Sequence, residues 1–160
     1  MSDSSTFINQ PASGSDESDI EVLFGQRCHR HHNPNGSLGG WVSETAYVAP
    51  TAYVDPKAQV LDYAKVYGNA RVLDNARVYG HAEVYGYAWI FGHARVFDYA
   101  QVYGNVRIFG HTMVFDHAKV YGDARIFEDA QVFEDAQVFG TAWLYGNARI
   151  CSTVRISGTA

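Results

Sequence analysis

Four histidines are the first side chains in this sequence that could do chemistry, and they are spaced by six residues or multiples of six. They are His81, His93, His111 and His117. A histidine can act as a general base or bind a metal ion through a ring nitrogen. His93 and His111 stand eighteen residues apart, so they would lie one coil apart on one edge if the chain winds in turns of that length. Two ligands with no carboxylate between them form only a weak, adventitious site, and we predict no metal site here.

The position that these histidines share favours a structural role. The same place in other repeats holds asparagine or aspartate, at Asn69, Asn75, Asn105, Asp123 and Asp129. Such residues are typical of turns because they tolerate the backbone conformation that a turn requires. His93 and His111 also lack a visible partner that would orient either ring as a general base. We therefore interpret the histidines as corner residues, with catalysis by His93 or His111 as the alternative.

A second group of candidate ligands stands at residues 28–32, where the sequence is CHRHH. A thiol and imidazoles could bind zinc or copper, but these spacings match no standard zinc finger. Cys28 and Cys151 lie far apart in dissimilar contexts, so they indicate neither a disulfide framework nor a CxxC pair. Cys151 replaces an aromatic residue of the repeat, and we interpret it as a variation in packing. We predict no metal and no cofactor.

The histidines at the corner positions belong to a strict six-residue repeat. Residues 40–159 divide into 20 hexads without an insertion, and the third residue of every hexad is Val, Ile or Leu. The first residue is Ala in 16 of these hexads. A six-residue period drifts against the helical turn of about 3.6 residues, and β-branched and aromatic residues favour strands. The pattern therefore predicts short strands with inward Ala and aliphatic side chains, stacked into a solenoid.

A second period of eighteen residues predicts that each coil has three sides. The residue after the aromatic is glycine in one unbroken column: Gly68, Gly86, Gly104, Gly122, Gly140 and Gly158. The aromatic residues sort into columns in the same way. A six-residue repeat does not by itself require this sorting, whereas three walls per coil do. The predicted fold is an all-β, single-stranded, three-sided parallel β-helix over residues 40–160, about 32 Å long if strands stack roughly 4.8 Å apart.

Residues 1–39 differ in composition from the repeat. They are rich in Ser, Asp, Gly and Asn, with one short apolar island, IEVLF. Such a segment buries too little apolar surface to offset the entropy of ordering. We predict a disordered acidic tail, whose apolar island could dock on the end of the domain.

Composition also limits the classes of function. The net charge of −5 includes no basic footprint for nucleic acid. No apolar run approaches the length of a membrane span, and the first residues lack the features of a secretory signal. We expect a cytoplasmic protein that binds neither nucleic acid nor a membrane.

The repeat units resemble those of the hexapeptide-repeat proteins, in which an aliphatic residue is followed by two or three turn-forming residues and a small residue. The resemblance extends from GGWV at residues 39–42 to Ala160, and this start, with units such as AKVYGN, is similar to the YdcK-like, acyltransferase-like branch. The resemblance implies a left-handed β-helix of triangular section. It also implies acyl-CoA-dependent acyltransferase chemistry in trimers, with a catalytic histidine near a subunit cleft and commonly an extruded loop. No loop interrupts the 20 hexads of this chain.

The outward aromatic residues are the main candidates for a binding surface. They are Trp89, Phe91, Phe109, Phe127, Trp143, Tyr67, Tyr85, Tyr103 and Tyr121. Stacked aromatic and arginine side chains could simply stabilise neighbouring coils, but extensive exposed apolar surface also marks interfaces. Trp89 and Trp143 share a column with Arg71, Arg107 and Arg125, which makes that wall the favoured contact face.

We predict a non-catalytic structural or interaction module. It would form a homo-oligomer or bind a protein partner through the aromatic ladders and an open strand edge at its C-terminal end. An acyl-CoA-dependent enzyme with a site between subunits is the alternative that the resemblance implies. A carbohydrate-binding surface is a third, weaker hypothesis.

Overall fold

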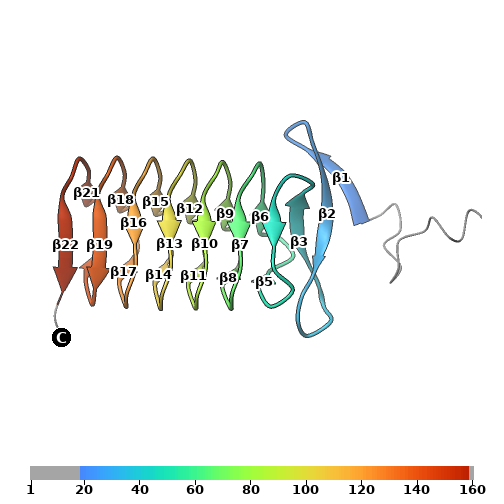
Figure 1. Ribbon diagram of the computed structural model, residues 1–160, viewed down its shortest axis with the longest axis horizontal. Coiled ribbons are helices and arrows are strands. Elements are labelled where there is room, and N and C mark those ends of the chain that lie inside the picture. The colour runs from blue at the N-terminus through green and yellow to red at the C-terminus, as the bar shows by residue number, and fades with distance from the viewer. Residues whose placement is uncertain (1–18, 159–160) are drawn as a thin grey trace, which may run out of the picture.

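The computed structural model describes residues 19–158, and these residues form a β-solenoid of three sheets that run side by side along one rod (Figure 1). The predicted fold class is confirmed, since the coils are built from short parallel strands and no α-helix occurs between residues 19 and 158. No helix in this part of the chain is therefore long and apolar enough to span a membrane.

We name the three sheets wall A, wall B and wall C. Wall A contains β1 (Ile20–Leu23), β2 (Gln26–His32), β3 (Leu38–Ser43), β6 (Gln59–Val60), β9 (Arg77–Val78), β12 (Arg95–Val96), β15 (Met113–Val114), β18 (Gln131–Val132) and β21 (Arg149–Ile150). Wall B contains β4 (Tyr47–Val48), β7 (Lys65–Val66), β10 (Glu83–Val84), β13 (Gln101–Val102), β16 (Lys119–Val120), β19 (Gln137–Gly140) and β22 (Arg155–Gly158). Wall C contains β5 (Tyr53–Val54), β8 (Arg71–Val72), β11 (Trp89–Ile90), β14 (Arg107–Ile108), β17 (Arg125–Ile126) and β20 (Trp143–Leu144).

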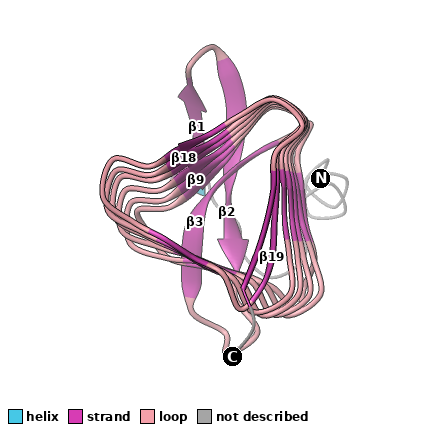
Figure 2. Cartoon of the chain, turned by 90° about the vertical axis from the view of Figure 1, so that its left-hand side faces the viewer, coloured by secondary structure: helices cyan, strands magenta, loops and turns pink. Residues whose placement is uncertain are grey.

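Each coil pairs with the next in a constant register. On wall B, for example, Val66 pairs with Val84 and Val84 with Val102, always eighteen residues further along the chain. This confirms the three-sided coil. Viewed from the C-terminal end in Figure 2, the chain passes clockwise from β18 to β19 while it approaches the viewer, so the coils wind in the left-handed sense.

The first and third residues of the units build the core, as predicted. Ala76 and Val78 are fully buried, and so are their counterparts in the central coils. Burying one valine side chain contributes about 1.5 kcal/mol or more. Thr112 replaces the usual Ala and is also buried, but its hydroxyl donates a hydrogen bond to the carbonyl of Phe109 at 2.7 Å, so its polar group remains satisfied.

From Asp62 to Ser152, the fifth residue of each unit makes the corner and has a positive φ. At Gly104 φ is +80°, and an added Cβ would lie 2.8 Å from the carbonyl oxygen of Gly122, so only glycine fits without strain. Asp62 and Asp74 adopt φ of 57° and 55°. Each carboxylate accepts a hydrogen bond from the backbone N–H of the corner residue one coil further along, Gly80 at 2.8 Å and Gly92 at 2.9 Å. These hydrogen bonds offset the cost of a positive φ in a residue with a side chain.

The N-terminal segment requires a correction. Residues 1–39 were predicted to be disordered, but β1 and β2 form an antiparallel hairpin, and β2 pairs with β3 along the end of wall A (Figure 1). The apolar island IEVLF supplies β1, which pairs with β2 as the outermost strand and keeps most of its side chains exposed, so β2 and not β1 lies against the coils. Residues 1–18 lie outside the described part, so the prediction for them remains untested.

Side-chain hydrogen bonds attach this segment to the first coil. A ring nitrogen of His31 lies 2.9 Å from the carbonyl oxygen of Ala52. The amide of Asn33 donates to the carbonyl of Val54 at 3.0 Å and accepts from the Val54 N–H at 2.8 Å. The composition argument missed these contacts because it counted only the apolar surface that could be buried.

Candidate interaction surface

The corner histidines are exposed members of stacked columns. His93 and His111 stack with ring centroids 5.0 Å apart and planes inclined by 4°, one coil apart as expected. His81 stacks between two tyrosine rings of the same column. Each of these histidine rings stacks on another ring. A general base needs instead a hydrogen-bonding partner that orients its ring. Within residues 19–158, no three His, Cys, Asp or Glu side chains are grouped so that they could hold a metal ion.

The CHRHH cluster is divided between the two faces of β2. Cys28 and His31 are buried, whereas His29 and His32 are exposed. Burial raises the pKa of the Cys28 thiol and lowers the pKa of the His31 imidazole. These side chains do not converge on one point, and they belong to the hairpin that covers the first coil. Cys151 is half-buried in the last coil.

The predicted aromatic ladders exist, but the faces of their rings are largely occupied within the chain. The tyrosine column from Tyr67 to Tyr121 stacks with centroids 4.7 to 5.1 Å apart. Phe91, Phe109 and Phe127 stack in the same way, at 4.7 and 5.1 Å. All of these rings are half-buried. Stacking at these distances stabilises neighbouring coils, and it leaves mainly ring edges for a partner.

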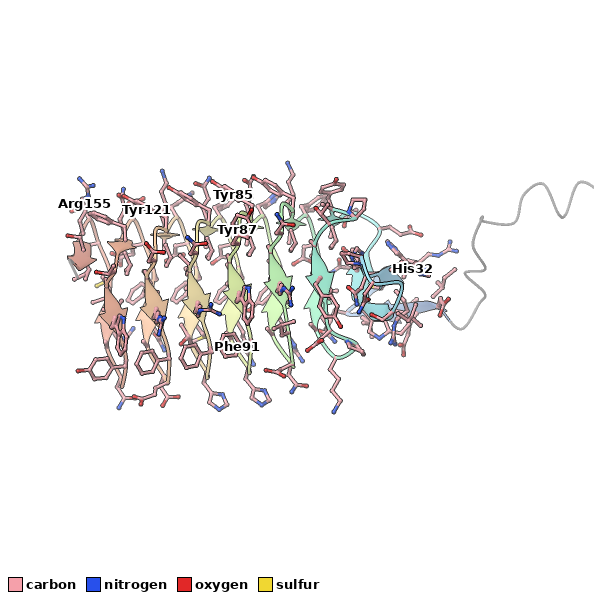
Figure 3. All side chains as sticks on the ribbon, turned by 90° about the horizontal axis from the view of Figure 1, so that it is seen from below. His32, Tyr85, Tyr87, Phe91, Tyr121 and Arg155 are labelled. Atoms are coloured by element: carbon pink, nitrogen blue, oxygen red, sulfur yellow. The ribbon has the colours of Figure 1, made fainter. Side chains whose placement is uncertain are left out.

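The two sets of ladder residues lie on different walls. Tyr67, Tyr85, Tyr103 and Tyr121 directly follow strands of wall B, whereas Phe91, Phe109 and Phe127 follow strands of wall C. Figure 3 shows Tyr85 and Tyr121 along one edge of the rod and Phe91 along the opposite edge. The predicted binding residues therefore form two surfaces, and only the tryptophans and phenylalanines share wall C.

Wall C carries an outward column in which arginines stack on aromatic rings. Its members in chain order are Tyr53, Arg71, Trp89, Arg107, Arg125 and Trp143. The guanidinium carbons of Arg71 and Arg107 lie 5.2 and 4.4 Å from the centroid of Trp89, so the Trp89 ring is covered on its two faces. Each such cation–π contact contributes on the order of 0.5–1 kcal/mol at an exposed site. A sugar ring cannot stack on Trp89 without displacing an arginine, which argues against the carbohydrate hypothesis at this residue.

The most exposed aromatic residues of the central coils stand at corners that sequence analysis assigned to polar turn residues. Tyr63, Tyr87 and Tyr99 are 56%, 62% and 54% exposed. Tyr63 and Tyr99 alternate with His81 and His117 in one stacked column. A shallow groove of about 380 Å³ runs between this column and Lys65, Glu83, Gln101 and Lys119 of wall B. The signal was in the sequence, because these tyrosines occupy the sixth position of their units.

At the last coil, side chains of the core type become accessible. Val154 is 44% exposed, whereas Ala136, one coil earlier in the same column, is fully buried. Trp143 and Tyr145 are 58% and 60% exposed, and Ile150 and Ile156 are half-buried. At the N-terminal end the first coil is covered, because β2 and the side chains of His31 and Asn33 lie against it.

The comparisons with known proteins point to the same repeat. Residues 64–78 and 100–114 match the family model described as YdcK Beta solenoid repeat. The two matched segments contain β7 to β9 and β13 to β15, and each begins at an inward alanine and ends at an inward valine. The sequence matches no curated protein. The chain is thus a β-solenoid built from six-residue units, and two of its segments are similar to the YdcK beta solenoid repeat.

Proposed function

We propose that this protein is a non-catalytic interaction module, a rigid rod that self-associates through its last coil. The observation that carries the proposal is the exposure of Val154, whose counterparts are buried in the central coils. Covering Val154, together with Trp143 and Tyr145 of the last units, would remove apolar surface from water, at about 25 cal/mol for each Å².

The backbone of the last coil supports the same proposal. In the central coils the N–H groups at the second, fourth and sixth positions donate to carbonyls of the next coil, as from Lys65, Tyr67 and Asn69 at 2.8 to 3.0 Å. The equivalent N–H groups of Arg149 and Arg155 meet no further coil within residues 19–158. A strand edge with unpaired N–H groups is a template for pairing with a strand of another chain.

The arrangement that fits these ends is a closed, tail-to-tail dimer. At the other end, His31 and Asn33 already occupy the carbonyls of Ala52 and Val54, and β2 pairs with the edge of β3. A head-to-tail contact would therefore have to displace the hairpin. In an isologous contact each last coil meets its own copy, and β22, with four residues, is longer than most strands of the coils.

Sedimentation equilibrium over a wide range of concentrations tests the proposal. We expect the mass to rise from 17.7 kDa to twice that value. The variant Val154→Glu places a charge in the contact and should weaken the dimer by about tenfold or more. Arg155→Pro removes one edge N–H and should act in the same direction.

Val22→Glu is the matched control, because Val22 is 67% exposed at the opposite end of the rod. This variant should dimerise like the unaltered protein. A strict monomer at every concentration would contradict the proposal. So would a dimer that is lost in Val22→Glu and kept in Val154→Glu.

A further inference from the structure

We propose that Arg107 and Arg125 on wall C form a binding site for the carboxylates of an acidic, extended segment of a partner polypeptide. The site lies on the side of the rod and does not require self-association through the last coil. With this site, the protein would bind acidic peptide segments of other proteins.

The two arginines are direct neighbours in register. Arg107 of β14 pairs with Arg125 of β17, so the two side chains leave the sheet about 4.8 Å apart. Like charges placed opposite each other in a sheet are destabilising. The charge columns of wall B avoid such a pair, because Glu83 and Gln101 separate Lys65 from Lys119.

No carboxylate of the described part of the chain neutralises the pair. Between residues 19 and 158, Arg27 and Glu44, 3.2 Å apart, form the only ion pair, and it lies at the N-terminal end. A second in-register arginine pair, Arg77 and Arg95, occurs on wall A. Arg77 stacks over Phe24 of the hairpin at 5.7 Å. Burial raises the pKa of Tyr79, and the nearby charge of Arg95 opposes this effect. The pair on wall A thus lies beside the N-terminal hairpin, whereas the pair on wall C contacts aromatic rings of its own wall.

Two tryptophans hold the pair on wall C from its outer sides. Arg107 lies 4.4 Å from the ring centroid of Trp89, and Arg125 lies 5.4 Å from that of Trp143. A guanidinium that stacks on a ring keeps its in-plane N–H donors free for a bidentate contact with an oxoanion. Because stacking already restricts both side chains, binding an anion costs less conformational entropy than it would at a free arginine.

The surroundings of the pair favour a peptide over other anions. Phe109 and Phe127 form a half-buried apolar strip on one side, which can contact apolar side chains next to an acidic one. On the other side Asp123, which accepts a hydrogen bond from Asn105 at 3.3 Å, repels a ligand that is charged along its whole length. The site is open to solvent, so a single free anion would be weakly held.

A labelled peptide with two Glu residues separated by a single Thr and flanked by uncharged residues, acetylated and amidated, is the probe for this site. When the peptide is extended, its Glu side chains lie on one face. We expect fluorescence anisotropy to show binding that weakens with salt. The double variant Arg107→Gln/Arg125→Gln should weaken this binding by about tenfold. The same peptide with Gln in place of Glu should not bind.

Arg77→Gln/Arg95→Gln is the matched control, since it removes the same charge from wall A. It should change peptide affinity by less than about twofold, because screening limits the reach of exposed charges. Thermal unfolding followed by circular dichroism checks that the variants fold. Should the glutamine variant on wall C not fold, Arg107→Lys/Arg125→Lys keeps the charge but removes the bidentate geometry, and it should still weaken binding several-fold.

Three results would overturn the proposal. One is an equal loss of affinity in the two double variants, which would indicate attraction by net charge alone. Another is equal binding of the Glu and Gln peptides. The third is inorganic phosphate that competes with the peptide at equal concentration, which would identify a site for small anions.

Discussion

The carboxylate of Asp74 accepts a hydrogen bond at 2.9 Å from the backbone N–H of Gly92, which stands one coil further along the chain. Asp74 itself has φ of 55°, a conformation that few side chains adopt without strain. A side chain of one coil therefore supports the corner of the next. The same relationship recurs from Asp62 to Gly80 and from Glu134 to Ser152.

This corner hydrogen bond predicts a graded response at Asp74. Asp74→Ala removes the acceptor and keeps the positive φ, so we expect a loss of about 1–2 kcal/mol in the free energy of unfolding. Asp74→Asn keeps an acceptor and tolerates the left-handed conformation, so its loss should be smaller. Urea unfolding measures both variants, and an alanine variant as stable as the unaltered protein would contradict this account of the corner.

Substitutions at two corner glycines allow the cost of backbone strain to be measured apart from the cost of steric conflict. An added Cβ at Gly104 would meet the carbonyl oxygen of Gly122 at 2.8 Å, whereas at Gly146 the nearest atom is a side-chain oxygen of Glu128 at 3.8 Å. Both glycines have a positive φ. Gly146→Ala should cost about 1 kcal/mol from conformation alone, and Gly104→Ala should cost clearly more because the coils must also move apart. Equal losses in thermal unfolding would show that the close approach is unimportant.

The docking of the hairpin depends on Asn33. Its side chain both donates to and accepts from the backbone of Val54. Asn33→Ala should leave these backbone groups without partners, at a cost of about 1–3 kcal/mol, and should expose the hairpin to proteolysis while the coils persist. Hydrogen exchange of residues 20–43 and of the central coils provides the measurement. Uniform loss of protection along the whole rod would instead show that the hairpin and the coils unfold together.

The tyrosine column predicts a loss of stability in alkaline solution. Burial, followed by the charge of Glu83, raises the pKa of Tyr67 from its ordinary value of 10.0 to about 12. The folded state therefore favours the neutral phenol, and this contribution is complete below pH 10.0 and is lost as the pH rises toward about 12. Tyr67→Phe cannot ionise, so its urea midpoint should fall less steeply across this range. An identical pH dependence in the variant would contradict the role of Tyr67.

Much of the fold follows from a few sequence positions. Val66, Val84 and Val102 are inward at every eighteenth residue, and the structure pairs them in that register. A strict repeat without insertions leaves one geometry in which each aliphatic residue is buried, because a one-residue slip would turn these side chains outward. The candidate surface was less predictable. Alternation places Tyr67 and Phe91 outside the core and leaves open whether their rings stack between coils or face a partner, and the structure shows that the ring faces are covered by the next coil.

The sequence by itself determined the three-sided coil, the inward alanines and valines, and the corner position of the histidines, because these depend on a periodic pattern that is local in the chain. Only the tertiary structure decided which outward groups remain available. The sequence placed Arg107 and Trp89 in one column, but the stacking of the guanidinium on the Trp89 ring and the docking of His31 on Ala52 depend on distances across coils. These contacts combine charge, stacking and backbone hydrogen bonding between residues of different coils. A periodic pattern of residue types does not give the distances on which their strength depends.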